Sequence, residues 1–428
     1  MIKLCIFFIS VMVFSSCSLK ENVNIQANEK AFVDEDTYIL FALRAEEVHD
    51  NKSAADLFTT LYEKSDKKEY IYRSLENDLM ARENEKLIQR VNSLQKENTS
   101  DFSLMRYKVV ALFELNRLDE AIKLSVLLAS KTKKPNDYLL TSDIYIKRQE
   151  FDLAVKYLES AYAKENNEKI LDKMSIILYV NLGRKKEAIA HLETYSRMLG
   201  YSELICLRLI AFYSNDNNID GLLTANLRLY EFDKSPKVAK RIIQIYTYKQ
   251  NYIGLTKFLE KSNSNDEVLL QLYASLKYYD KAYVLASKLY SKTLNMDYLG
   301  QSAIYEYESA LNQSSKVLLK SVITKLEKVV QANNQTIYLN YLGYILIDHE
   351  VDIKKGMKYI DRVLVLQPKS VFYLDSKAWG YYKLGECKKA DKLIKEVAKM
   401  EGGDDPEVKV HIIKINKCLK NIKGKKRK

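Results

Sequence analysis

The sequence has few of the residues that make tight turns. Its 428 residues contain 12 glycines and 4 prolines, and no glycine precedes Gly183. Many short strands would need more of both residues, because turns between strands rely on them. Neither GxGxxG nor GxxxxGK[ST] occurs, which excludes the two common phosphate-binding loops. The composition therefore favours an all-α chain.

Groups that support catalysis or metal binding are also scarce. The histidines are far apart in the sequence, with no HExxH motif and no zinc-type Cys/His spacing: His49, His191, His349 and His411. Carboxylates are plentiful, but no two stand out as an acid and base pair. We therefore expect no metal, no cofactor and no enzymatic activity.

Five cysteines occur without any CxxC pair, at positions 5, 17, 206, 387 and 418. The pattern is not that of a disulfide-rich scaffold. Cys5 and Cys17 belong to an N-terminal leader, and the other three are interpreted as small apolar fillers. The alternative for two of them is a bridge between Cys387 and Cys418 in an oxidising compartment.

The net charge of +12 is concentrated at the C-terminal end. Residues 407–428 carry nine Lys or Arg and one acid, Glu407, which gives a net charge of +8. Such an end is usually only solvated. The alternative is that residues 409–428 dock on an anionic lipid or a cell-wall surface.

The first residues have the features of a secretory signal. Lys3 precedes a mainly apolar run from Leu4 to Phe14, and two small residues then stand directly before Cys17. A run of this length is too short to cross a bilayer, which needs about 20 residues. The pattern is typical of a leader that is cleaved.

The Phe-Ser-Ser-Cys stretch ending at Cys17 resembles the lipoprotein box of bacterial lipoproteins, although Leu is more usual than Phe14 there. The resemblance implies removal of residues 1–16, acylation of Cys17 and a tether over residues 17–35. Two or three acyl chains would anchor the protein stably to a membrane. Ser18 further implies a periplasm-facing place at the outer membrane. The alternative is an ordinary signal in which Cys17 is incidental.

The rest of the chain repeats at about 34 residues. One series of tyrosines has intervals of 34, 34 and 33 residues: Tyr145, Tyr179, Tyr213 and Tyr246. A series of alanines has intervals of 33 and 34: Ala121, Ala154 and Ala188. Each alanine begins an i, i+4, i+7 pattern, which is one face of a helix. Two registers that repeat together predict a pair of helices in every period.

Residues 336–402 resemble the tetratricopeptide repeat most closely. The matching positions are Leu342, Gly343, Gly356, Ile360, Val363 and Pro368, then Ala378, Tyr381, Gly385, Ala390, Ile394 and Val397. The resemblance implies a tetratricopeptide-type helical-repeat solenoid, a right-handed superhelix of antiparallel helix pairs. We expect ten to eleven pairs over residues 36–401, followed by a capping helix and basic tail over 402–428.

Small residues in these repeats have a physical reason. Where two helices pack closely, one side chain at the contact must be small, which explains Gly343 opposite Gly356. Gly183 and Gly385 stand where a first helix should end in a left-handed residue. The prolines are expected at boundaries between helices. The 32 tyrosines are interpreted mainly as core residues, with an exposed stacking surface as the alternative.

The tetratricopeptide resemblance also implies that ligands lie along the concave face formed by the first helices. In the two best repeats this face comprises Asn340, Tyr344, Asp348, Asp375, Trp379, Tyr382 and Lys383. An exposed Trp379 among polar groups would be a typical binding hot spot. The alternative is that Trp379 packs against a neighbouring helix or the final capping helix.

Together these features predict a membrane-anchored, non-enzymatic scaffold that binds other proteins and not nucleic acid. The alternative function is an accessory protein that binds peptidoglycan or another anionic envelope surface through its basic C-terminal tail. The sequence does not identify the partner.

Overall fold

The computed structural model describes residues 30–97 and 101–425, with side chains over 30–95 and 101–420. Every regular element in those ranges is a helix. The described residues form two compact units, and the boundary follows Ala225. The prediction of an all-α, helical-repeat fold is confirmed. The leader, Cys17 and the extreme C-terminal residues lie outside the described ranges.

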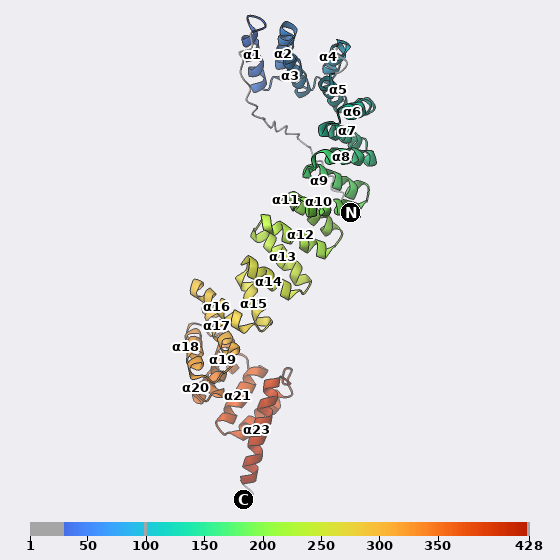
Figure 1. The fold of residues 1–428 in the computed structure, drawn as a ribbon. Coiled ribbons are helices and arrows are strands. Elements are labelled where there is room, and N and C mark those ends of the chain that lie inside the picture. The colour runs from blue at the N-terminus through green and yellow to red at the C-terminus, as the bar shows by residue number, and fades with distance from the viewer. Residues whose placement is uncertain (1–29, 98–100, 426–428) are drawn as a thin grey trace. The chain divides into compact units, whose positions relative to one another are not determined.

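The first unit contains eleven complete helices, one π-helical segment (η1) and the start of a twelfth helix, as counted over its described residues. They are α1 (Glu35–Glu47), α2 (Asn51–Ser65), α3 (Lys68–Met80), α4 (Asn84–Glu97), α5 (Phe102–Glu114), α6 (Leu118–Thr132), α7 (Pro135–Lys147), α8 (Phe151–Glu165), α9 (Glu168–Ile176), η1 (Ile177–Asn181), α10 (Lys185–Leu199), α11 (Glu203–Asn215) and α12 (Ile219–Phe232). In Figure 1 they follow one another from blue to green.

The second unit continues the pattern to the end of the described chain. Its helices are α13 (Pro236–Tyr248), α14 (Tyr252–Ser262), α15 (Asp266–Ser275), α16 (Tyr279–Thr293), α17 (Met296–Ser309), α18 (Lys316–Ala332), α19 (Thr336–Asp348), α20 (Ile353–Leu366), α21 (Val371–Lys383), α22 (Cys387–Val397) and α23 (Pro406–Lys425). Figure 1 shows them from yellow-green to red. Odd-numbered helices are called first helices below, and even-numbered helices second helices.

Within each unit a first helix packs against the second helix that follows it, and each second helix packs against the next first helix. The repeating residues occupy the predicted places. Ala121, Ala154 and Ala188 are fully buried on second helices. Tyr145 and Tyr213 are buried on first helices, with Tyr179 in η1. The two registers of the sequence therefore correspond to the two helices of each pair.

Helices α19 and α20 approach each other closely through two glycines. A Cβ added to Gly343 would lie 2.7 Å from Ile360 Cδ1, and one added to Gly356 would lie 2.7 Å from the carbonyl oxygen of Gly343. Larger residues would separate the pair, as the small-residue pattern predicts. The apolar side chains of the second unit gather around this contact, with Leu342, Leu346 and Val363 buried.

Helix ends follow the turn residues that the sequence does contain. Pro135, Pro236 and Pro406 each begin a helix, and Pro368 lies between α20 and α21. Gly183 and Gly385 have positive φ angles of 67° and 77° in the turns between first and second helices. Most other turns of this kind use a non-glycine residue in the same left-handed conformation: His49, Arg82, Asn116, Gln149, Asn217, Gln250, Lys277 and Glu350.

Candidate partner-binding face

The seven residues predicted to form a binding face lie on two successive first helices, α19 and α21. The structure brings the two groups together. Trp379 Nε1 donates a hydrogen bond of 2.9 Å to Asp348 Oδ1, and Lys383 Nζ donates one of 2.6 Å to the carbonyl oxygen of Asp348. Lys383 Nζ also lies 3.0 Å from Glu350 Oε1. These contacts tie α21 to the C-terminal end of α19.

Trp379 is not exposed, so the expectation of an exposed aromatic hot spot is wrong. Its side chain is only 1% accessible. The indole stacks on the His411 ring of α23, with centroids 4.0 Å apart, and on the Tyr382 ring, with centroids 4.6 Å apart. The alternative interpretation, in which Trp379 packs against the final capping helix, is confirmed. The reason is that α23 extends the array by one more first helix and covers α21.

Asp375 is buried by the same helix. It is 5% exposed, and His411 is 3% exposed. His411 Nδ1 donates to the carboxylate, at 2.9 Å from Oδ2 and 3.0 Å from Oδ1. A buried carboxylate needs such a partner, because an unpaired charge would be expensive in this environment. Asp375 therefore holds α23 in place instead of facing solvent.

Tyr344 is half-buried and directed toward the start of α23. Burial raises the pKa of Tyr344, and the charge and hydrogen bond of Glu407 raise it further. One helical turn earlier on α19, the side-chain oxygen Oδ1 of Asn340 is buried and accepts no hydrogen bond from the described residues. Native structures leave few acceptors in this condition. The α19 side of the face is thus polar and only partly satisfied.

The accessible part of the face is narrower than predicted. Tyr382, Asp348 and Lys383 are half-buried, with the side chains of Asp348 and Lys383 29% and 16% exposed. The ammonium groups of Lys383 and Lys414 lie 5.3 Å and 5.0 Å from the centre of the Trp379 ring. Cations at this distance from an indole are attracted to its face. The solvent-accessible part of the face is therefore an edge of α19 and α21 with charges of both signs, and it surrounds the buried Trp379.

The covalent alternative raised by the sequence is present. Cys387, the first residue of α22, and Cys418 of α23 form a disulfide, with Cα atoms 6.0 Å apart. This separation is usual for bridged cysteines. The interpretation of these two cysteines as apolar fillers is therefore wrong, whereas it holds for Cys206, which is buried. The bridge fastens the middle of α23 to the beginning of α22.

Sequence reasoning missed a series of hydrogen bonds between successive first helices of the second unit. In each, an aromatic hydroxyl or ring N–H donates to a carboxylate: Tyr298 to Glu267, Tyr338 to Asp297, Tyr341 to Glu308, Trp379 to Asp348 and His411 to Asp375. The partners are 31 to 41 residues apart. An aromatic residue and a carboxylate about one repeat apart in the sequence were the signal that could have predicted these hydrogen bonds.

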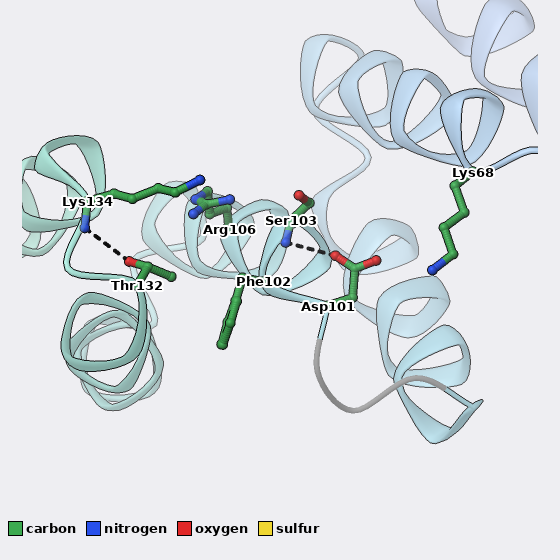
Figure 2. A pocket seen from close by; sticks show the side chains of 7 residues that line it. All are labelled: Lys68, Asp101, Phe102, Ser103, Arg106, Thr132 and Lys134. Carbon is green, nitrogen blue, oxygen red and sulfur yellow. Dashed lines mark hydrogen bonds between the residues drawn. The ribbon is translucent and has the colours of Figure 1, made fainter.

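The first unit contains a separate, open hollow near the N-terminal ends of α3, α5 and α7 (Figure 2). Its volume is about 510 Å³, and its lining is polar apart from Phe102: Lys68, Asp101, Phe102, Ser103, Arg106, Thr132 and Lys134. The Arg106 guanidinium is already bound to Asp137, at 2.6 Å and 2.8 Å. Asp101 accepts the amide of Ser103 at 2.9 Å and so caps α5. Asp101 and Arg106 are thus already engaged, one in capping a helix and the other in an ion pair.

No three His, Cys, Asp or Glu side chains converge in a metal-binding arrangement within residues 30–95 and 101–420. Over the described part of the chain, every helix is also too short or too polar to cross a bilayer.

Comparison with known proteins adds one relative in sequence. No family model matches the chain. A TPR repeat-containing protein of Methanocaldococcus jannaschii is 24% identical over 321 residues, which cover 72% of this chain. The match covers 51% of the archaeal protein, so the chain spans about half the length of the curated relative it matches.

Two solved structures are similar over much of the chain. The hetero-tetramer Cut9–Hcn1 of the APC/C has 9% identity and a TM-score of 0.36, with 90% of this chain and 97% of that chain covered. A tetratricopeptide repeat protein from Parabacteroides merdae has 13% identity and a TM-score of 0.29, with 66% and 98% covered.

The successive helix pairs define a helical-repeat solenoid. Its sequence is similar to that of the archaeal TPR repeat-containing protein, which agrees with a repeat of tetratricopeptide type.

Proposed function

We propose that this protein is a membrane-anchored, periplasm-facing scaffold that binds other proteins along its first helices. The observation that carries the proposal is the array itself. Consecutive helix pairs from Glu35 to Val397 present one first helix after another, and a surface of this kind holds extended peptides or partner helices.

The anchor in this proposal is Cys17, which lies outside the described residues. Its support is the short apolar run and the small residues that precede it. The Cys387–Cys418 disulfide supports export as well, because disulfides persist in oxidising compartments and are rare in the cytosol. Ser18 is the basis for placing the anchor at the outer membrane.

The partner face in this proposal is the accessible edge of α19 and α21. Tyr382 and Lys383 provide an aromatic ring and a cation, and Asp348 provides a carboxylate, all on a base fixed by buried contacts. Asn340 contributes a buried acceptor without a donor, and Tyr344 lies between it and Asp348. A rigid aromatic centre with adaptable polar groups around it is typical of binding surfaces.

The test is affinity capture from crosslinked, solubilised membranes, comparing the intact protein with a Tyr382→Ala, Lys383→Ala variant. Lys358→Ala, Tyr359→Ala is the matched control, because that adjacent pair lies on the second helix α20. We expect a defined protein to be recovered by the intact chain and the control and lost by the first variant. Equal recovery by all three would exclude this face.

Anchoring is tested separately by metabolic labelling with a clickable palmitate analogue. The intact chain should incorporate the label and fractionate with membranes. Cys17→Ser should lose the label. It should also lose most of its membrane association, because the acyl chains on Cys17 are the proposed anchor. Unchanged labelling in Cys17→Ser would show that Cys17 is not the acylated residue.

A second function is favoured by the basic end of the chain, where exposed lysines on α23 such as Lys417 and Lys420 lead into residues 421–428, which carry five further Lys or Arg. They would bring the C-terminal tail to peptidoglycan or anionic lipid. The assay is cosedimentation with purified wall or with phosphatidylglycerol vesicles, using a chain that lacks residues 421–428. Binding should fall sharply in this shortened chain and with rising salt, and unchanged binding would exclude the function.

A further inference from the structure

Helix α23 occupies the position that the next first helix of a longer array would have. It packs against both α22 and α21, in the way that α21 packs against α20 and α19. Its buried residues Val408 and Ile415 join a cluster formed by Ala378, Ala390 and Ile394. The face of α21 that sequence analysis predicted to bind a partner is therefore already occupied, and its occupant is a helix of the same chain.

The contacts of α23 define which chemistry this face accepts. His411 lies against Trp379 and donates to the carboxylate of Asp375. The ammonium group of Lys414 lies 5.0 Å from the centre of the same indole. A helix that binds here thus needs a flat hydrogen-bond donor, a cation one turn away, and apolar side chains on the same side. A basic amphipathic helix has these features.

Two covalent connections hold α23 on this face. One is the eight-residue segment 398–405, which joins it to α22. The other is the Cys387–Cys418 disulfide, which closes a loop over a sequence separation of 31 residues. Cys387 is 2% exposed and Cys418 is only partly buried, so the Cys418 sulfur is the end more open to solvent. Loss of the disulfide would leave α23 attached by the segment alone.

We propose that the face of α21 is a groove for basic amphipathic helices, that α23 fills it in cis, and that the Cys387–Cys418 disulfide keeps it closed. The proposal rests on the scaffold function and adds its regulation. Reduction opens the groove, and a partner helix then competes with α23 for Trp379 and Asp375.

The opening step is thiol–disulfide exchange with an external dithiol. A thiolate of the dithiol attacks one sulfur of the bridge and forms a mixed disulfide, while the other cysteine leaves as a thiolate and takes up a proton. The second thiol of the dithiol then displaces the first cysteine. The bridge has gained two electrons and two protons, and the external dithiol has become a disulfide.

The experiment is amide hydrogen exchange, read by mass spectrometry, on the full chain with and without dithiothreitol. Exchange reports local opening even when the open state is rare. Removal of a disulfide that closes a loop of this size should accelerate exchange in α23 on the order of a hundredfold. Exchange in α19 and α20 should stay unchanged. Equal rates in α23 under both conditions, or equal acceleration throughout the second unit, would overturn the proposal that the disulfide keeps the groove closed.

The groove is tested in the same samples with a fluorescent peptide of residues 406–420 in which Cys418→Ser prevents disulfide exchange with Cys387. The peptide should bind the reduced chain at least about tenfold more tightly than the oxidised chain, because only the open population is competent. Cys418→Ser should bind like the reduced chain without any reductant. Cys206→Ser, at a buried cysteine of the first unit, should keep the response to reductant. Absence of peptide binding to the reduced chain would overturn the groove.

The outcomes separate this proposal from the scaffold function. Capture of the same amount of a cellular partner by oxidised and reduced protein would refute control by the disulfide. It would still support the scaffold function. Peptide binding that depends on reduction, together with no captured partner, would support the groove and refute the scaffold function.

Discussion

The two units connect neighbouring first helices with a different balance of donors. Tyr70 and Tyr179 of the first unit also donate to carboxylates, and Lys383 of the second also binds at Asp348, but the remaining junctions differ. From α5 to α11 each junction has a cation facing a carboxylate: Arg106 with Asp137, Lys173 with Asp143, and Arg208 with Asp172. From α15 to α23 the donors are aromatic hydroxyls and ring N–H groups, such as Tyr341 to Glu308 at 2.9 Å and Trp379 to Asp348 at 2.9 Å. The same repeat geometry is thus fastened in two ways.

The difference in donors goes with a difference in burial. The cations of the first unit are partly exposed, as with Arg106 at 30% and Lys173 at 39% of the side chain. In the second unit Tyr338, Trp379 and His411 are all at most 3% exposed. A cation needs solvent at one end, whereas an aromatic ring supplies apolar area together with its donor. Three of the five polar junctions named in the second unit are therefore part of its core, whereas the donors Tyr298 and Tyr341 are half-buried.

The largest effect should come from removing the central ring of the second unit. Trp379→Ala should lower the free energy of unfolding by about 3–5 kcal/mol, because it leaves a cavity and removes the hydrogen bond from the indole to Asp348. Chemical denaturation followed by far-ultraviolet circular dichroism measures this change. Trp379→Phe, which keeps the stacked ring, should cost clearly less. Equal costs for the two variants would mean that the ring contributes no packing.

The corresponding change in the first unit is Asp137→Ala. Asp137 is 1% exposed and accepts both Arg106 and Thr132. Its loss should cost about 3 kcal/mol, the lower end for a broken buried pair, because Arg106 can still reach water. Asp119→Ala is the control, since the Arg148–Asp119 pair is exposed and should contribute almost nothing. A similar loss of stability in Asp137→Ala and Asp119→Ala would contradict the difference in burial between the two carboxylates.

A smaller effect is expected from Tyr338→Phe. Asp297 keeps the hydrogen bond from Gln301 Nε2 at 2.6 Å, so the loss should be about 1.5 kcal/mol, at the low end for bonds to charged groups. Burial and the hydrogen bond to Asp297 raise the pKa of Tyr338 above its ordinary value of 10.0. Its contribution is therefore complete below pH 10 and declines as the pH rises further.

The measurement for Tyr338 is a series of denaturation curves from neutral to alkaline pH. The intact chain should lose stability above about pH 10, and Tyr338→Phe should lose less over the same range. Identical slopes for the two proteins would show that this hydroxyl is not linked to folding.

The first unit should show the opposite dependence at its N-terminal end. Burial alone would raise the pKa of Glu35, but hydrogen bonds from Lys67, Tyr70 and the amide of Ala31 outweigh it and lower that pKa to about 2. The stability it provides is present above pH 4.5 and is lost as the pH falls toward 2. Thermal melts of the intact chain and of Glu35→Gln should converge over this range. A constant difference would refute the linkage.

The smallest effect should be that of salt. An ionic strength of about 1 M shortens the screening length to about 3 Å and weakens exposed ion pairs such as Arg148–Asp119. Local hydrogen exchange should rise slightly at the exposed pairs of the first unit, and less at the aromatic junctions of the second. A larger rise in the second unit would reverse the proposed contrast.

The fold could be predicted from the sequence because its period is carried by residues with a clear physical role. Ala154 and Gly356 are small where helices meet, and each proline falls between helices or at the start of one. The left-handed turns were predicted only at Gly183 and Gly385, since residues such as Gln149 and Lys277 adopt this conformation without a sequence signal. Tertiary packing, not local preference, sets those turns.

The candidate site was predicted less well. The seven residues do share one face, but an exposed position on α21 assumed that the predicted capping helix would leave this face open. His411, the residue that covers Trp379, entered the sequence analysis only as one of four widely separated histidines, because histidine alone gives no indication of its partner. The bridge between Cys387 and Cys418 was only one of two alternatives, since sequence spacing does not fix a disulfide.

The central claim, that partners bind the accessible edge of α19 and α21, is tested most directly by photocrosslinking in the cell. A photoreactive amino acid would replace Tyr382 on α21 in one strain and Tyr138 on α7 of the first unit in another. The account predicts a discrete crosslinked protein at position 382 and none at position 138. The same crosslink at both positions, or one at position 138 alone, would contradict it.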